Sequence, residues 1–452
     1  MTPPPDLSCL TEAEKDALIV AQWRQIEEQS ERIATLEAKL GGPTKGPGNS
    51  SVPPSQGRKA NKPRGGGGQK RRRGHGRGGR KLSENPDQRV AAKPTRCPHC
   101  QAGLERAASK LHQRYDKIDL PPVRPIVTQV SLYGADCPCC GAHVVAPAPE
   151  GLEPGSPFGP RIGALAVYLR YGQIIAYRRL AKLFGELWGV AISEGGLANL
   201  FQRARPSFDA QVQAILARLR ASRIVCSDET GARIKGRNAW EWVFQNDELS
   251  FHVIKNSRAK AVAEAVMDGH KPAIWVSDLY SAQRGHGERW QICLAHQLRD
   301  CQYAIEAGDK IFAAPMKRLL LRACALGRRR HRLKDTTLER YAQDLERRLD
   351  KIMACQPSQP DAKRLRKRYG KDRDSLFTFM TDRDVPATNN GSERAIRMST
   401  IFRKVTGGFR SHWGAKFYAD VRSTLNTGRK QGLTDFQAIE RTLRDRAILR
   451  PG

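Results

Sequence analysis

The sequence RIVCSDETGARI, residues 223–234, places two acids, Asp228 and Glu229, inside a run that otherwise has the apolar pattern of a buried β-strand. Two more strand-like runs follow after short polar turns: NAWEWVFQND at 238–247 and LSFHVIKNS at 249–257. RAKAVAEAVMDG at 258–269 then has helical spacing, and PAIWVSDLY at 272–280 is a continuously apolar strand typical of a sheet buried on both faces. The stretch therefore predicts three antiparallel strands, a crossover helix and a fourth strand.

This order of elements predicts an α/β core of the ribonuclease H type. Asp228 lies on the first strand and Asp278 at the end of the fourth, and we expect these strands to be neighbours. Two carboxylates at one sheet edge repel each other unless a divalent cation lies between them. The pair therefore predicts a magnesium site, whereas Glu229 should point to the opposite side because side chains alternate along a strand.

The charge of the whole chain indicates the kind of partner. Among 452 residues, 78 Lys and Arg outnumber 46 Asp and Glu, which gives a net charge of +32. Such a chain attracts polyanions, and nucleic acid is the first candidate. No apolar run approaches the roughly 20 residues needed to cross a bilayer, and the start lacks a signal peptide. With eleven cysteines, an odd number, the chain is expected in the reducing cytosol and not at a membrane.

The first 95 residues divide into two parts of different composition. Residues 1–41 predict a helix with Ile19, Ile26, Ile33 and Leu40 spaced by seven, either one half of a coiled coil or a single amphipathic helix. Residues 42–95 form a basic linker rich in Gly and Pro, which predicts disorder. Its arginines Arg71, Arg72 and Arg73 are expected to contact DNA phosphates; the alternative is a solvated spacer.

Residues 96–150 contain two C-x-x-C pairs, CPHC and CPCC. Four thiolates suit tetrahedral Zn²⁺, so a small zinc module is predicted, with one structural ion held by Cys97, Cys100, Cys137 and Cys140. The intervening residues alternate β-branched side chains, which favours a hairpin or small sheet. Unrelated buried thiols are the alternative.

Residues 151–221 predict a helical DNA-binding region. A helix should end near Leu187, break at Gly189 and restart with Ser193 as N-cap. This is the form of a helix-turn-helix, in which the second helix enters the major groove, although an ordinary helical hairpin has the same pattern.

Residues 222–452 are expected to form the catalytic domain, with an all-helical insertion at about 300–385. The 114 residues between Asp278 and Glu393 exceed what a strand needs to reach its next helix. Glu393 follows NNGS, a helix-start signal with Asn390 or Ser392 as N-cap, and so lies in the first turn of a helix. Asp382 and Asp384 are weaker candidates for a third metal ligand because Pro386 favours an extended loop.

Several motifs in one order give the chain a family resemblance: NSSVPPS at residue 49, the four cysteines, SDET at 227, VSDLY at 276, CLAH at 293, NNGSERAIR at 389 and RKVTGGFRS at 403. The chain resembles the insertion sequence 66 family of DDE transposases. The resemblance implies catalytic acids at Asp228, Asp278 and Glu393, a Mg²⁺ cofactor, and cutting and joining at the ends of a mobile DNA element. It also implies a bacterial, nucleoid-associated protein that acts as a homo-oligomer on DNA, with accessory proteins encoded by the same element.

The residues independently fit this chemistry. Three carboxylates can anchor two Mg²⁺ or Mn²⁺ ions, which steady the attacking and leaving oxygens of a phosphodiester. Basic residues after Glu393 suit double-stranded DNA near the cut: Arg394, Arg397, Arg403, Lys404 and Arg410. His296 is either a proton-transfer or orienting group or a structural histidine. Two alternatives stay open: a metal-dependent nuclease that does not join strands, and a zinc-containing DNA-binding regulator derived from a transposase.

Overall fold

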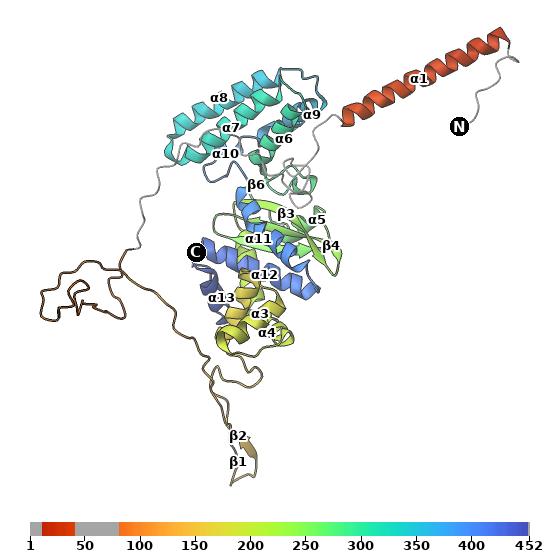
Figure 1. Ribbon diagram of the computed structural model, residues 1–452. Coiled ribbons are helices and arrows are strands. Elements are labelled where there is room, and N and C mark those ends of the chain that lie inside the picture. The colour runs from red at the N-terminus through yellow and green to blue at the C-terminus, as the bar shows by residue number, and fades with distance from the viewer. Residues whose placement is uncertain (1–10, 41–80, 451–452) are drawn as a thin grey trace.

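The computed structural model describes residues 11–40 and 81–450 and has a mixed five-stranded sheet at its centre (Figure 1). The strand order is β5-β4-β3-β6-β7. The strands are β3 (Ile224–Ile234), β4 (Arg237–Gln245), β5 (Ser250–Lys255), β6 (Ile274–Ser277) and β7 (Arg289–Ile292). Strands β3, β4 and β5 pair antiparallel, whereas β6 pairs parallel with both β3 and β7. The predicted three antiparallel strands, crossover helix α5 (Ala261–Met267) and fourth strand are all present.

The long strand β3 lies in the middle of this sheet. Its register with β6 pairs Ile224 with Ile274, Val225 with Trp275 and Cys226 with Val276. The paired residues, 224–226 and 274–276, are all apolar, as expected for strands covered on both faces. The sequence reading missed β7, a four-residue edge strand that begins with an exposed arginine.

Helices cover the two faces of the sheet with different side chains. On one face, α4 (Glu194–Arg220) and α5 pack onto Val225, Trp242 and Phe244. On the other, α11 (Asn390–Thr406) packs on β3 and β4, and α12 (His412–Lys430) packs on β5. Burial on both sides removes the sheet from water and fixes the strand ends in place.

The helices before the sheet form an aromatic core with the end of the chain. The helices are α2 (Pro160–Val167), η3 (Tyr168–Gly172), α3 (Tyr177–Trp188) and α4, and they meet α12 and α13 (Asp435–Leu443). Tyr171 makes edge contacts with Phe201 and Phe417, with ring centroids 5.1 and 5.2 Å apart. Gly189 ends α3 in the left-handed conformation, φ 67°, and the Ser193 hydroxyl accepts a bond from the Gly196 amide. Both predicted signals, the break and the cap, are therefore confirmed.

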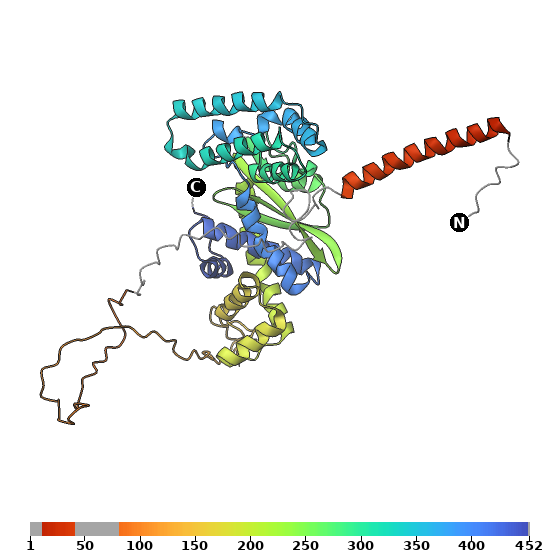
Figure 2. The same ribbon diagram turned by 45° about the horizontal axis from the view of Figure 1, so that its top comes forward.

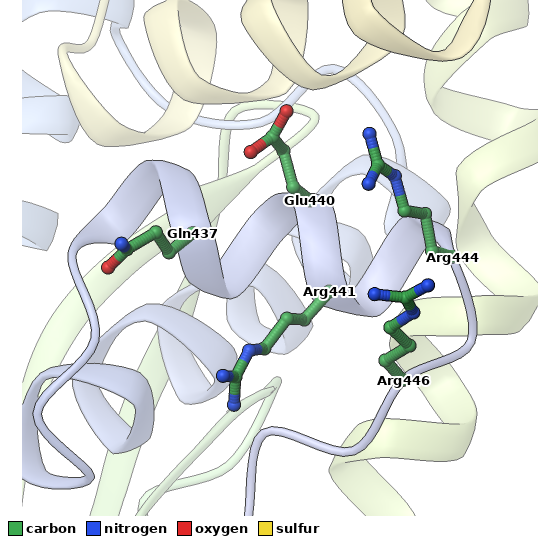
Figure 3. A pocket seen from close by; sticks show the side chains of 5 residues that line it. All are labelled: Gln437, Glu440, Arg441, Arg444 and Arg446. Atoms are coloured by element: carbon green, nitrogen blue, oxygen red, sulfur yellow. The ribbon is translucent and has the colours of Figure 1, made fainter.

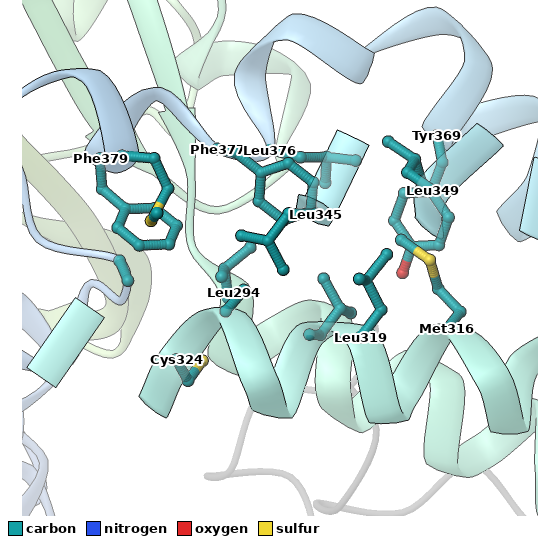
Figure 4. Close-up of a cluster of buried hydrophobic side chains, with 14 of the residues drawn as sticks. Leu294, Met316, Leu319, Cys324, Leu345, Leu349, Tyr369, Leu376, Phe377 and Phe379 are labelled. Atoms are coloured by element: carbon teal, nitrogen blue, oxygen red, sulfur yellow. The ribbon is translucent and has the colours of Figure 1, made fainter. Parts of the chain in front are cut away.

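A helical subdomain separates β7 from α11, as the long spacing predicted. It consists of α6 (Leu294–Glu306), α7 (Ala313–Arg329), α8 (Asp335–Met353), α9 (Pro360–Lys371) and α10 (Thr378–Thr381), with the short turns η5 (Arg330–Arg332) and η6 (Arg373–Ser375). Another short turn, η4 (Ser281–Gln283), follows β6. Figure 4 shows the apolar side chains between the helices of this subdomain, among them Leu319, Leu345 and Phe379, which are all buried. The same cluster includes Val276 of β6, so the insertion is packed onto the sheet.

Of the described residues, helix α1 and residues 81–150 lie apart from this body in both views (Figures 1 and 2). Helix α1 (Glu12–Leu40) is present as predicted, with Ile19, Ile26 and Ile33 each more than half exposed. The linker up to residue 80, including Arg71, Arg72 and Arg73, lies outside the described residues.

The expected hairpin between the two cysteine pairs is absent from the described residues 81–150. Residues 108–133 have no regular structure, and the strands β1 (Gly134–Asp136) and β2 (His143–Val145) flank only the second pair. Ile126 is 94% exposed and Val127 is 88% exposed. β-branched alternation is therefore present without the pairing partner that a strand requires.

In the described part of the chain, no helix has both the length and the apolar character needed to span a membrane.

Candidate active site

Asp228 and Asp278 lie at the same edge of the sheet because their strands are parallel neighbours. Cys226 pairs with Val276, and each acid follows its paired residue by two positions along the chain. Asp228 is half-buried within β3, whereas Asp278 is half-buried just beyond the end of β6. The amide of Tyr280 donates a 2.9 Å hydrogen bond to Asp278 Oδ1 and fixes that carboxylate. The predicted convergence of the two acids is confirmed by the strand register.

Glu393 approaches from the helix above them. It lies in the first turn of α11, which packs on β3. The predicted N-cap was wrong: neither Asn390 nor Ser392 caps the helix. The position before the helix is held by Asn389, whose side chain makes no cap bond.

Asn389 instead joins the three segments that carry the motifs. Its side-chain amide donates 2.7 Å to the carbonyl of Ser227, the residue before Asp228. Its backbone amide donates to Cys293 Sγ at 3.0 Å, and its Oδ1 accepts 2.7 Å from the Ser392 hydroxyl. A residue 2% exposed thus ties the start of α11 to β3 and to the start of α6. The motif NNGSER contained this residue, but only the fold reveals its partners.

The acids interact through their charges. Burial raises the pKa of Asp228, and the carboxylates of Glu229, Asp278 and Glu393 raise it further. Burial likewise raises the pKa of Asp278, with added repulsion from Asp300 and Glu393, although Tyr280 and Arg258 oppose the shift. The cluster therefore holds negative charge that nearby protein groups do not fully neutralise. A bound cation is the usual remedy for such an arrangement.

Glu229 has separate partners, in agreement with the prediction that it points away from Asp228. Arg258 donates to its Oε1 at 2.6 and 3.0 Å, and Gln283 donates to its Oε2 at 2.7 Å. The Arg258 guanidinium stacks on the Tyr280 ring, with Arg258 Cζ 3.9 Å from the ring centroid. Sequence reasoning missed Arg258 and Gln283, which lie in loops without a spacing signal.

The carboxylate of Glu393 is held by a cation from the insertion. Arg299 Nη2 donates to Glu393 Oε1 at 2.7 Å, and His296 Nε2 lies 3.8 Å from the same oxygen. Burial lowers the pKa of His296, and the nearby Arg299 lowers it further. The Nδ1 atom of this histidine is buried without a hydrogen-bond partner. Both residues come from the first turns of α6, so the insertion contributes directly to the site.

Asp382 and Asp384 have a different role. Arg223 bonds to both, at 2.6 Å for Asp384 Oδ2, and holds the pKa of Asp382 below its usual range. Arg223 precedes β3, five residues before Asp228, which is roughly 17 Å along a strand. These acids therefore fasten the end of the insertion to the opposite end of β3.

A metal ion would need a tighter cluster than the structure holds. Across residues 11–40 and 81–450, no three His, Cys, Asp or Glu side chains come together closely enough to hold one. The acid site nevertheless has the donors that Mg²⁺ uses, carboxylate oxygens, with charge in excess. Arg299 occupies the Glu393 carboxylate in this arrangement.

The two cysteine pairs are separate as well, although each has the local shape of a metal knuckle. Cys97 and Cys137 have equivalent turns: the amide of each cysteine donates 2.9 Å to the carbonyl five residues on, Ala102 or Ala142. Backbone amides of Cys100 and Cys140 lower the pKa of the Cys97 and Cys137 thiols, respectively. In each pair the first thiol is therefore shifted toward the thiolate, the form that binds zinc.

The basic residues after Glu393 form a stripe on α11. Arg394, Arg397 and Lys404 are exposed, at spacings of three and seven, and Arg410 is exposed beyond the helix. In the described part of the chain no carboxylate pairs with these four residues. Arg403 differs, because its guanidinium donates to the carbonyl of Gly231 on β3 and so fastens the helix to the sheet.

A shallow pocket on α13 lies outside the acid site (Figure 3). It is lined by Gln437, Glu440, Arg441, Arg444 and Arg446. In Figure 3 the side chains of Arg441 on α13 and of Arg444 and Arg446 beyond its end point in different directions, and Glu440 contributes an opposing charge. The pocket therefore lacks a focused site for an anion.

The sequence model described as the transposase IS66 family matches residues 155–417, which is more than half of the chain. The match contains Asp228, Asp278 and Glu393 together with the whole insertion. No curated protein matches this chain.

Proposed function

Because this chain belongs to the transposase IS66 family, we propose that it binds the terminal repeats of a mobile DNA element and catalyses metal-dependent strand cleavage and strand transfer. The observation that supports the proposal is electrostatic: the carboxylates of Asp278, just beyond the parallel strand β6, and of Glu393, on the later helix α11, both raise the pKa of Asp228 on β3. Structural ion pairs place each acid beside a cation, whereas Asp228 has three carboxylates as its electrostatic neighbours.

The sheet is proposed to be a ribonuclease H-like core. Its support is the order β5-β4-β3-β6-β7, with three antiparallel strands followed by two parallel ones. Asp228, Asp278 and Glu393 would hold Mg²⁺ or Mn²⁺. When bound, such ions activate the attacking oxygen and stabilise the departing oxygen of a phosphodiester.

The chain's own residues then position DNA. Arg394, Arg397 and Lys404 lie along α11, whose first turn carries Glu393, so a phosphate backbone bound to them would extend toward the acids. Asn389 keeps the start of that helix against β3. Tyr280 and Arg258 stack at the side of the site and hold Glu229 out of it. Arg299 bonds to Oε1 of Glu393, so a metal that used this oxygen would compete with the Arg299 ion pair.

The remaining parts are proposed to recognise DNA. Cys97, Cys100, Cys137 and Cys140 would share one structural zinc; the turns that lower the pKa of the Cys97 and Cys137 thiols support this assignment. Helices α3 and α4, with Gly189 between them, would act as a helix-turn-helix. The N-terminal helix α1 has exposed isoleucines spaced by seven that suit pairing with a second copy.

A strand-transfer assay tests the proposal. Purified protein is incubated with a labelled duplex from the end of the element that encodes it, a target duplex, and Mg²⁺ or Mn²⁺. We expect cleaved and joined products that are lost in Asp278→Asn while binding to the end persists. Cleavage without joining would identify a nuclease. Specific binding without cleavage in either metal would identify a regulator and overturn the enzymatic proposal.

A further inference from the structure

Two buried serines on α11 bond to the same strand. The Gln245 amide donates to Ser392 Oγ at 3.2 Å, and the Ser399 hydroxyl donates to Glu241 Oε1 at 2.8 Å. Gln245 and Glu241 are four residues apart on β4, and the serines are seven residues apart on α11. Seven residues of helix span about 10.5 Å and four of strand about 13 Å, so one helix can touch both points.

Each serine is fully engaged. Ser392 also donates to Asn389 Oδ1, and Ser399 also accepts 2.9 Å from the Tyr418 hydroxyl of α12. Both serines, with Glu241 and Gln245, are less than 10% exposed. Glycine at position 391 leaves the necessary room, because a Cβ there would lie 2.8 Å from Gln245 Nε2.

Glu241 is part of a larger buried network. His252 Nδ1 donates to it at 2.8 Å, while His252 Nε2 accepts 2.9 Å from the Asn426 amide. Burial lowers the pKa of His252, which is consistent with this neutral tautomer. The network therefore joins β4, β5, α11 and α12 through one carboxylate.

Such a network costs free energy to bury, so its use at this interface needs a reason. The apolar contacts of α11, from Ile396 and Phe402, are not directional and tolerate sliding. Hydrogen bonds between buried groups tolerate little sliding of the helix, because a shift of α11 along the sheet would leave both donor and acceptor unsatisfied. A one-residue slip moves a helical position by about 1.5 Å and turns it by about 100°.

We propose that Ser392 with Gln245 and Ser399 with Glu241 are positioning residues that fix the register of α11 and thereby place Glu393 opposite Asp228. Glu393 directly follows Ser392, so the first contact sets its height and the second sets the direction of the helix axis. The inference rests on the proposed function for its consequence in catalysis, although the register itself is a property of the metal-free protein.

The test uses the full chain with Ser392→Ala and Ser399→Ala. Thr442→Val is the matched control, because Thr442 is a buried helical hydroxyl that bonds only a carbonyl within α13. Ser399→Thr, which keeps a hydroxyl, is the rescue. We expect amide hydrogen exchange within residues 390–406 of the metal-free protein to rise by about tenfold in both alanine variants and not in the control.

The second measurement is the Mg²⁺ dependence of cleavage. The alanine variants should need severalfold more Mg²⁺ for half-maximal rate and should lose about tenfold or more at saturation, with binding to element ends unchanged. Wild-type exchange in α11 together with wild-type metal dependence in both variants would overturn the inference. If the wild-type protein shows no cleavage with either Mg²⁺ or Mn²⁺, the proposed function fails. The exchange measurement alone then decides whether the register of α11 depends on the serines.

Discussion

Asp228 is in a position where a charged carboxylate destabilises the metal-free protein. Its pKa is raised by burial and by neighbouring acids. The contribution of this group to the free energy of unfolding is therefore largest below its pKa in the unfolded chain, about 3.9, and is lost as the pH rises through its pKa in the folded protein. Asp228→Asn removes that loss. At pH 7 without metal, the variant should unfold with a free energy about 1–2 kcal/mol larger than wild type, and the gain should vanish near pH 4.

Chemical denaturation at several pH values checks this prediction, and added Mg²⁺ gives a second readout. Saturating metal should stabilise the wild type and leave Asp228→Asn unchanged, because a ligand stabilises only the state that binds it. A variant less stable than wild type at pH 7 would show that the Asp228 carboxylate is a structural partner and not a strained anchor.

Glu393 and Asp382 provide a direct comparison of two acids near the end of the insertion. Glu393→Gln should reduce cleavage to the metal-free background, because it removes a metal-binding charge, while loss of the half-buried, solvent-accessible Arg299 pair costs about 1 kcal/mol. Asp382→Asn should retain cleavage, because this acid pairs with Arg223 at the far end of β3. The two variants are compared side by side in cleavage and thermal unfolding. If Glu393→Gln cleaved DNA and Asp382→Asn did not, Asp382 and not Glu393 would be the third metal-binding acid.

At the scale of elements, the four core strands could be predicted because apolar periodicity and buried runs are local properties. RIVCSDETGARI and PAIWVSDLY each carry a continuous signal, and both became central strands. Strand β7 could not be found, since four residues with an exposed arginine have no such signal. The start of α11 was predicted one to three residues late, with Asn390 or Ser392 as N-cap in place of Asn389. The side chains of Ser392 and Asn389 bond to the sheet, which the local sequence does not indicate.

The cysteine knuckles lead to a prediction about folding. If the two pairs bind one zinc, the 36 residues between Cys100 and Cys137 must rearrange, and the exposed apolar side chains among them can then become buried. Zinc should therefore slow amide exchange across residues 108–133, with about one ion per chain by metal analysis. Cys137→Ser should lose both effects, whereas Cys355→Ser, at a cysteine far away in sequence, should lose neither. Freshly reduced protein without zinc would contradict the assignment.

At the scale of the whole molecule, charge should govern affinity for DNA. Residues 57–81 carry eleven Lys or Arg and no acid. Replacing those cations with Ser and Gln should lower the slope of log affinity against log salt by at least about 3, since each neutralised phosphate contributes about 0.9. Cleavage at saturating DNA should persist. Fluorescence anisotropy from 50 to 300 mM NaCl measures the slope, and an unchanged slope would make this segment a spacer.

Some contacts in the acid site join residues that are far apart in the sequence, and these contacts could not be predicted. Asp228 and Asp278 could be paired from strand order, but Arg299 and Asn389 could not be assigned roles. Their partners, Glu393 and Ser227, lie 94 and 162 residues away along the chain. Contacts of this kind depend on how the insertion packs, which no local pattern records.

The helical insertion has a consequence for the time at which the enzyme becomes complete. A ribosome makes Asp228 and Asp278 first, then the whole insertion, and only afterwards Glu393. A nascent chain can therefore contain the central strands and the basic residues 57–81 while the third acid does not yet exist. A messenger truncated within α6–α10 would give a product with two acids and no α11. The order of translation thus completes the set of three acids only after the insertion that supplies Arg299 has been made.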